Sequence, residues 1–143
     1  MSATPPPATP LTRKLGIKPE ARVAALAAPS GFEALLSPLP GGVVLRTGLE
    51  GATEPFDVVI AFAVLRAEVV DAVARARPLL APAGGLWIAW PKRGSGRATE
   101  VSDDLVREIA LPTGLVDNKV CAVDATWTAL RLVIRRELRR PAG

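Results

Sequence analysis

The stretch DVVIAFA at residues 57–63 decides how we expect this chain to fold, because it is its most apolar segment. A continuous apolar run of this length is typical of a strand buried on both faces, as in a parallel sheet. Residues 66–80 follow with a helical pattern whose inner face is formed by Val69, Val70, Val73 and Leu80. Pro82 and the pair Gly84–Gly85 are expected to break that helix, and LWIAW at 86–90 predicts the next strand.

The sequence before this unit predicts two more strands. RVAALAA at 22–28 is a short apolar run that stops at Pro29, and GVVLRT at 42–47 is rich in β-branched residues. Between them, Ser30 is placed to cap a short helix that ends at the prolines of residues 38–40.

The sequence after this unit predicts a helix and a hairpin. Thr99 or Ser102 can cap a helix over the following residues, which Pro112 ends. Residues 119–123 and 129–135 read as strands, and the short link DATWT allows only an antiparallel connection. The chain is therefore predicted to be a single three-layer, Rossmann-like α/β domain. Its mostly parallel sheet should have about six strands and end in a C-terminal antiparallel hairpin.

Composition sets the boundaries of this domain and excludes several classes of site. We expect residues 1–10, rich in Pro, Ala and Thr, to be a disordered tail, residues 11–136 to be the domain, and residues 137–143 to be a basic tail. The sequence has no histidine and only Cys121, so no disulfide framework and no metal site is expected. It also contains no recognisable catalytic constellation.

Charge and hydropathy limit the partners. Arginines within residues 131–143 account for the whole net charge of +4, so the rest of the chain is neutral and nucleic-acid binding is disfavoured. The N-terminus lacks the pattern of a signal peptide, and the longest apolar run, residues 58–65, is too short to span a membrane. We therefore expect a cytoplasmic protein that does not interact with membranes.

Two stretches resemble class I methyltransferases. PFDVVIAFAVL (55–65) and PLLAPAGGLWIAW (78–90) are similar to the fourth and fifth strands of that fold, where an FDVV strand precedes a helix and LLxPGG leads into the next strand. The closing hairpin is similar as well. The resemblance implies a methyltransferase-like architecture.

The resemblance fails where that family binds its cofactor. Methyltransferases place a G-x-G loop after the first strand and an acid at the end of the second strand, to hold S-adenosylmethionine. Here the loop is AAPSGF (27–32), and Thr47–Gly48 stand at the end of the second strand, with Glu50 slightly late. No cofactor is therefore expected, although S-adenosylmethionine stays open as a ligand, and dinucleotide binding fails the same test.

From Leu11 onward the chain resembles a bacterial family catalogued as domain of unknown function 3052. The resemblance rests on TRKLGIKP (12–19), AWPKRGSGRATE (89–100) and LPTGLVDNKVCAVDATWTALRLVIRR (111–136). It implies the same small α/β fold and supplies no activity.

Ligands of open α/β sheets bind beyond the carboxyl ends of the parallel strands, where four stretches should meet: 29–31, 47–48, 92–99 and 124–127. From these we predict an anion-binding site with backbone N–H groups at a helix start, cations, hydroxyls and an aromatic wall. Its candidate ligand-binding residues are Ser30, Gly31, Lys92, Arg93, Ser95, Arg97, Thr99, Asp124 and Trp127.

Each part also has a purely structural interpretation. A loop of the 92–99 type is more often simply a solvated surface loop, and a serine placed like Ser30 is more often an N-cap than a nucleophile. Trp127 either folds back on the sheet or contacts a partner. The segment 117–119 is predicted to form a turn, with a partner-binding edge as the alternative. Cys121 should be a buried, inert thiol.

The sequence therefore favours a non-catalytic binding or interaction domain. Its ligand would be a small anion, a nucleotide-like molecule, or a protein partner at the 92–99 edge. The alternative is an S-adenosylmethionine-dependent methyltransferase with an atypical cofactor loop. A homodimer is a further option, since the sheet exposes strand edges.

Overall fold

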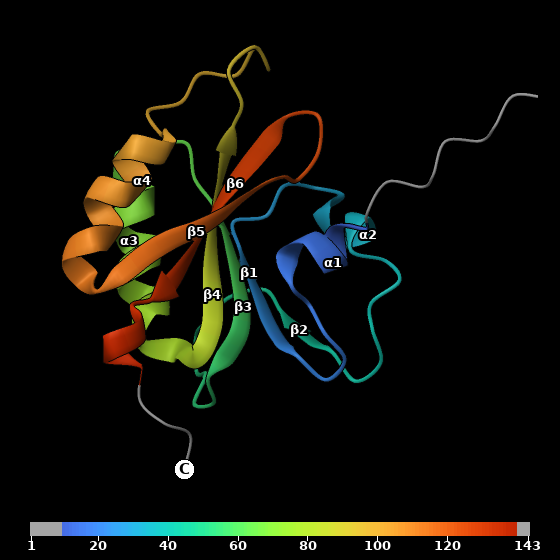
Figure 1. The fold of residues 1–143 in the computed structure, drawn as a ribbon. Coiled ribbons are helices and arrows are strands. Elements are labelled where there is room, and N and C mark those ends of the chain that lie inside the picture. Colours follow the sequence, from blue (N-terminus) through green and yellow to red (C-terminus); the bar gives the residue numbers. More distant parts are fainter. Residues whose placement is uncertain (1–9, 140–143) are drawn as a thin grey trace, which may run out of the picture.

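The computed structural model describes residues 10–139 as one six-stranded sheet with strand order β2-β1-β3-β4-β6-β5 (Figure 1). The strands β1–β4 are mutually parallel where they pair, β6 is antiparallel to β4, and β5 is antiparallel to β6. This confirms the predicted α/β class, the mostly parallel sheet and the C-terminal hairpin. The strand bounds are β1 (Arg22–Leu26), β2 (Val44–Arg46), β3 (Phe56–Phe62), β4 (Leu80–Pro91), β5 (Leu115–Ala122) and β6 (Trp127–Ile134).

Helices pack on both faces of the sheet and enclose two cores. One face carries α3 (Arg66–Ala76) and α4 (Asp103–Ala110), and the other carries α1 (Leu11–Leu15) and α2 (Phe32–Leu35) (Figure 1). Alternation along β3 divides its side chains, so that Val59 and Ala61 face α3 while Ile60 and Phe62 face the short helices. Because both faces of β3 are covered, its apolar run needs no polar positions, as the sequence predicted.

Three short 3₁₀ turns complete the described chain at Arg77–Leu79, Leu111–Thr113 and Arg136–Leu138. The last of these extends regular structure into the expected basic tail; most of that tail and of the N-terminal tail lies outside the described residues. No helix within residues 10–139 has the length and hydrophobicity to cross a bilayer.

The predicted break at Pro82 and Gly84–Gly85 is wrong, because these residues lie inside β4. The register between β3 and β4 shifts between Phe56 and Val58, which absorbs the irregular segment without ending the strand. A Cβ at Gly84 would lie 2.7 Å from the carbonyl oxygen of Phe56. Glycine therefore serves close backbone approach here rather than termination.

The predicted turn at Asp117–Lys119 is also wrong, since these residues lie within β5 at a second register shift. The Asp117 carboxylate accepts a hydrogen bond from Nε of Arg107 on α4, at 3.0 Å. A partner ten residues away thus replaces the backbone partner that a turn would supply.

Two helix details differ from the prediction and one agrees. Val70 is 46% exposed and lies on the outer side of α3. Gly31, at φ +87°, occupies the N-cap position of α2 without a side-chain hydrogen bond, so Ser30 is not the cap. Ser102 does cap α4, because its Oγ accepts from the Leu105 N–H at 3.2 Å.

Candidate functional site

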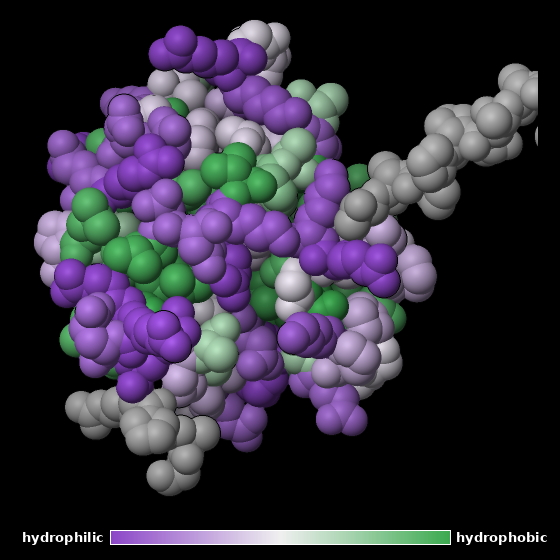
Figure 2. Space-filling model, viewed as in Figure 1, coloured by the Kyte–Doolittle hydropathy of each residue, from purple (hydrophilic) through white to green (hydrophobic). Residues whose placement is uncertain are grey.

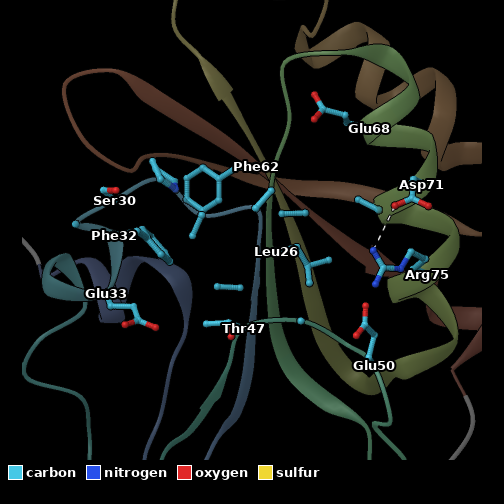
Figure 3. A pocket seen from close by; sticks show the side chains of 18 of the residues that line it. Leu26, Ser30, Phe32, Glu33, Thr47, Glu50, Phe62, Glu68, Asp71 and Arg75 are labelled. Atoms are coloured by element: carbon cyan, nitrogen blue, oxygen red, sulfur yellow. Dashed lines mark hydrogen bonds and ion pairs between the residues drawn. The ribbon is translucent and has the colours of Figure 1, made fainter.

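A cavity of about 670 Å³ lies where β1, β2 and β3 end, beside the first turns of α3 (Figure 3). The loop from the end of β1 to α2 forms one wall, Thr47–Glu50 after β2 form another, and α3 closes the side. The apolar floor comes from Leu26, Phe32 and Phe62. We call this the first cavity, and its position at the carboxyl ends of parallel strands is where such sheets bind ligands.

Acidic side chains dominate the lining of the first cavity. Glu33, Glu50, Glu68 and Asp71 line it, against the single cation Arg75. Oε1 of Glu68 accepts from the N–H groups of Val64 and Leu65, both at 2.9 Å, as part of the cap of α3. Asp71 pairs with Arg75 at 3.4 Å (Figure 3).

Glu33 and Glu50 are the two acidic residues of the first cavity whose carboxylates are available to a ligand. Within residues 10–139 neither carboxylate makes a hydrogen bond or ion pair, and both side chains are exposed to solvent. Figure 3 shows them on opposite sides of the cavity, with Thr47 between them. The cavity therefore offers hydrogen-bond acceptors and negative charge to whatever enters it.

The loop that follows β1 is held in an unusual backbone conformation. Ala27 lies at φ +55°, in the left-handed region that costs a residue with a Cβ about 1–2 kcal/mol. Gly31, also left-handed, ends the loop, and buried Phe32 anchors it edge-to-face on Phe62, with ring centroids 4.9 Å apart. Packing therefore fixes this loop, although it lacks the G-x-G pattern of the methyltransferases that the sequence resembles.

A second cavity, of about 770 Å³, is formed by the loop between β4 and α4. Lys92, Arg93 and Arg97 bring positive charge to it. Its acids are engaged elsewhere: Glu100 accepts from the Arg66 N–H at 2.8 Å, and Asp103 pairs with Arg107 at 3.4 Å. Its unengaged charge is therefore positive, opposite to that of the first cavity.

The structure divides the predicted site residues between these two cavities. Ser30 and Gly31 line the first cavity, whereas Lys92, Arg93, Arg97 and Thr99 line the second. The remaining candidates, Ser95, Asp124 and Trp127, line neither.

The polar members of the predicted set mostly hold local backbone. Oγ of Ser95 accepts from the Arg97 N–H at 3.3 Å, and Oδ1 of Asp124 accepts from the N–H groups of Thr126 and Trp127 at 2.8 Å. Oγ1 of Thr99 donates to the Val64 carbonyl at 2.9 Å. Their role as ligand groups stays a prediction.

Trp127 folds back onto the sheet, which decides between its two interpretations. It is 6% exposed and packs edge-to-face on Phe62, with centroids 5.1 Å apart. The Arg97 guanidinium lies 5.1 Å above its ring, in a cation–π contact. Phe62 lines the first cavity and Arg97 the second, so the two aromatic rings lie between the cavities.

Sequence reasoning missed most of the acidic lining. Glu33, Glu68, Asp71 and Arg75 were not predicted as site residues, and Glu50 was noted only as late for a ribose-binding acid. A local signal existed for Glu68, which stands at the third position of α3 as in a capping box.

Other reactive groups are not placed for chemistry. Cys121 is buried in β5, and this burial raises the pKa of its thiol. Within residues 10–139 no three or more Cys, Asp or Glu side chains form a group that could hold a metal ion.

Comparison with known proteins shows the family and the fold. The family described as "Protein of unknown function (DUF3052)" matches residues 48–136, which is more than half of the chain. Among curated proteins, none matches the sequence.

Solved structures of methyltransferases share the fold at low identity. A SAM-dependent methyltransferase from Aquifex aeolicus superposes with a TM-score of 0.60 at 12% identity, covering 87% of this chain and 88% of that one. The N-methyltransferase NodS from Bradyrhizobium japonicum gives 0.59 at 15% identity, covering 88% and 93%.

TrmN from Thermus thermophilus gives a TM-score of 0.61 at 16% identity and covers 87% of this chain. This chain spans only 47% of TrmN. The predicted methyltransferase-like architecture is thereby confirmed, and at such identities the likeness concerns the fold alone.

Proposed function

We propose that this chain, which belongs to the DUF3052 family of proteins of unknown function, is a binding domain for a nucleoside-type ligand without net negative charge. The ligand would occupy the first cavity. The observation that carries this proposal is the pair of unengaged carboxylates, Glu33 and Glu50, on opposite sides of an apolar floor. Sugar hydroxyls donate to carboxylates, and a planar base packs on apolar and aromatic side chains.

The size of the first cavity suits such a ligand. Its volume of about 670 Å³ lies within the range of roughly 300–1,000 Å³ typical of small-molecule sites. Apolar side chains for a base come from both sides of the sheet edge, with Leu26 on the α3 side and Phe32 and Phe62 on the other. Thr47 adds a hydroxyl between the two acids.

The charge of this cavity selects against phosphate-bearing ligands. Four acids against Arg75 leave a net negative lining, which repels phosphate groups and attracts cations. A small anion predicted from the sequence would instead suit the second cavity, where Lys92, Arg93 and Arg97 are gathered. A nucleotide-like ligand would have to direct its phosphate away from Glu33 and Glu50.

The proposal favours binding over catalysis on the chemistry of three residue types. The chain has no histidine to act as a general base, and within residues 10–139 the Ser30 hydroxyl makes no hydrogen bond that would activate it. Burial raises the pKa of the Cys121 thiol, which disfavours the nucleophilic thiolate.

A methyltransferase is the second candidate. Glu50 after β2 supports it, because the family resemblance expects a ribose-binding acid near that place, and the sulfonium of S-adenosylmethionine carries the charge that an acidic cavity favours. The Ala27–Gly31 loop argues against it, since it lacks the glycine pattern that lets the cofactor approach the backbone.

Thermal-shift measurements on purified protein test the proposal. The panel contains adenosine, S-adenosylmethionine, its demethylated product, AMP and inorganic phosphate. A ligand at about a hundred times its dissociation constant adds roughly 2.7 kcal/mol, a shift of several degrees. We expect shifts with adenosine or S-adenosylmethionine and weaker ones with AMP.

Variants locate the binding. Glu33→Gln and Glu50→Gln should reduce the shift, whereas Glu108→Gln, which removes the same charge from a surface pair on α4, should not. A nucleoside shift that survives the double variant E33Q/E50Q would refute the proposed site. No shift with any compound would point to a protein partner, and transfer of label from S-adenosylmethionine to a cell extract would favour the methyltransferase.

A further inference from the structure

We propose that the bare sheet face formed by β5, β6 and the first half of β4 is a docking surface for an acidic helical segment of a protein partner. Four cations lie on or beside this surface, which we call the cationic face: Lys14, Lys119, Arg131 and Arg139. In Figure 1 no helix lies in front of these strands, whereas α3 and α4 pack on their other side. Figure 2 shows hydrophilic residues running across the middle of this face.

The central observation is a pair of like charges directly opposite each other. Lys119 on β5 and Arg131 on β6 are cross-strand partners in the antiparallel ladder. Like charges at such positions destabilise a sheet. Within residues 10–139 the side-chain hydrogen-bond partner of Arg131 is Asn118, whose Oδ1 accepts from Nη1 at 3.4 Å, and a neutral amide leaves the charge uncompensated.

Arg131 is seated on the sheet rather than extended into solvent. Its guanidinium lies over Gly85 of β4, where an added Cβ would come within 2.5 Å of Nε. Burial, and secondarily the charge of Arg139, lowers the pKa of Arg131. Holding this partly buried cation against β4 therefore costs desolvation free energy.

The positive charge continues across the face in both directions. The carbonyl of Leu15 in α1 accepts from Nε1 of Trp87 at 3.1 Å, and Trp87 is the cross-strand partner of Arg131, so the neighbouring Lys14 lies beside this face. Nε of Arg139 donates to the Ile134 carbonyl at the end of β6, at 2.9 Å. Within residues 10–139 none of the four has a carboxylate within 4.0 Å. These four cations do not stabilise the monomer, whereas a partner with acidic side chains would neutralise them.

A protein segment fits this surface better than a nucleic acid. Sheets that bind single-stranded nucleic acid present aromatic side chains for stacking, and here every tryptophan and phenylalanine is buried. The opposite side of the same strands is already covered by helices. An acidic helix laid on the bare face would complete the missing layer and neutralise the cations.

The experiment measures binding of a fluorescently labelled oligo-glutamate peptide by anisotropy, with an oligo-uridylate RNA of similar charge as the alternative probe. We expect the peptide to bind at low salt and Lys119→Glu to weaken it about tenfold. Arg66→Glu is the matched control, because it makes the same change of charge on α3, on the opposite face.

Stability provides the second readout. Lys119→Glu replaces a repulsive cross-strand pair by an attractive one, so its melting temperature should rise by about a degree or more while binding falls. A lower melting temperature would overturn the premise of repulsion. Peptide binding that is absent, or lost equally in Arg66→Glu, would overturn the docking surface. Tighter RNA binding that Lys119→Glu abolishes would replace the protein partner by a nucleic acid.

Discussion

Replacing Trp127 by alanine should be one of the most damaging single changes in this chain, and its size follows from the contacts of the ring. The indole is 6% exposed and packs edge-to-face on Phe62, which packs in the same way on Phe32. Loss of a buried tryptophan costs about 3–5 kcal/mol, a total that includes the roughly 0.5–1.5 kcal/mol of its ring pair with Phe62. Domains of this size have a total stability of roughly 5–15 kcal/mol. Trp127→Ala should therefore leave the protein marginally folded.

The contact between Trp127 and Arg97 is separable from this packing. A cation over an exposed part of a ring contributes about 0.5–1 kcal/mol, so Arg97→Gln should destabilise by that amount in the native background. In Trp127→Phe, which keeps an aromatic ring and should destabilise less than Trp127→Ala, the Arg97→Gln change should cost less than in the native background. The difference between the two costs measures the coupling between guanidinium and indole.

Urea unfolding of the four proteins of this cycle supplies the free energies of unfolding, provided that each unfolds in one cooperative transition. Nucleoside binding should weaken in Trp127→Ala as well, because Phe62 and Phe32 line the first cavity and lose their support. The reasoning is refuted if Trp127→Ala loses less than about 1 kcal/mol. It is also refuted if the Arg97→Gln cost is identical over tryptophan and phenylalanine.

Three further changes test other parts of the structure. Gly84→Ala forces a Cβ to 2.7 Å from a carbonyl oxygen of β3 and should lower the free energy of unfolding by about 1–3 kcal/mol. Gly41→Ala, with no atom within 4 Å, is its control, and guanidinium unfolding compares the two. Ser102→Ala removes the cap of α4 and should cost about 1 kcal/mol by the same assay, with helix content retained. Burial raises the pKa of Cys121 above its ordinary value of 9.0, so the unfolded chain loses the thiol proton first and stability should fall as pH rises above that value. Melting curves of Cys121→Ala should lack this alkaline component; an unchanged pH dependence would contradict it.

The fold was predictable wherever local pattern and tertiary context agree. The apolar run of β3 and the DATWT link of the β5–β6 hairpin carry their structure in adjacent residues, and both predictions are confirmed. Pro82 and Gly84 carry the local pattern of a helix end, yet pairing with β3 across a register shift keeps them in β4. The partner strand β3 is more than twenty residues away in the sequence, so no local pattern indicates the pairing.

The candidate site was less predictable, because it depends on which loops share a wall. The carboxyl ends of the strands do meet at one edge, but Ser30 and Lys92 open into different cavities. The hydroxyl of Thr99 and the carboxylate of Asp124 fit a ligand site by residue type, while in the structure they hold backbone groups of their own loops. Residue type alone does not distinguish these two uses.

The distribution of charge in space is also not visible in the sequence. In sequence order the excess of +4 belongs to the arginines near the C-terminus, and the rest of the chain is neutral. In space that neutral remainder separates into an acidic first cavity, with Glu33 and Glu50 unengaged, and a contribution of Lys14 and Lys119 to the cationic face. The two surfaces therefore call for ligands of opposite charge, which neither the net charge nor its position along the chain reveals. Salt distinguishes them experimentally, since screening should weaken an acidic peptide on the exposed face far more than a nucleoside held by hydrogen bonds and apolar contacts in the cavity.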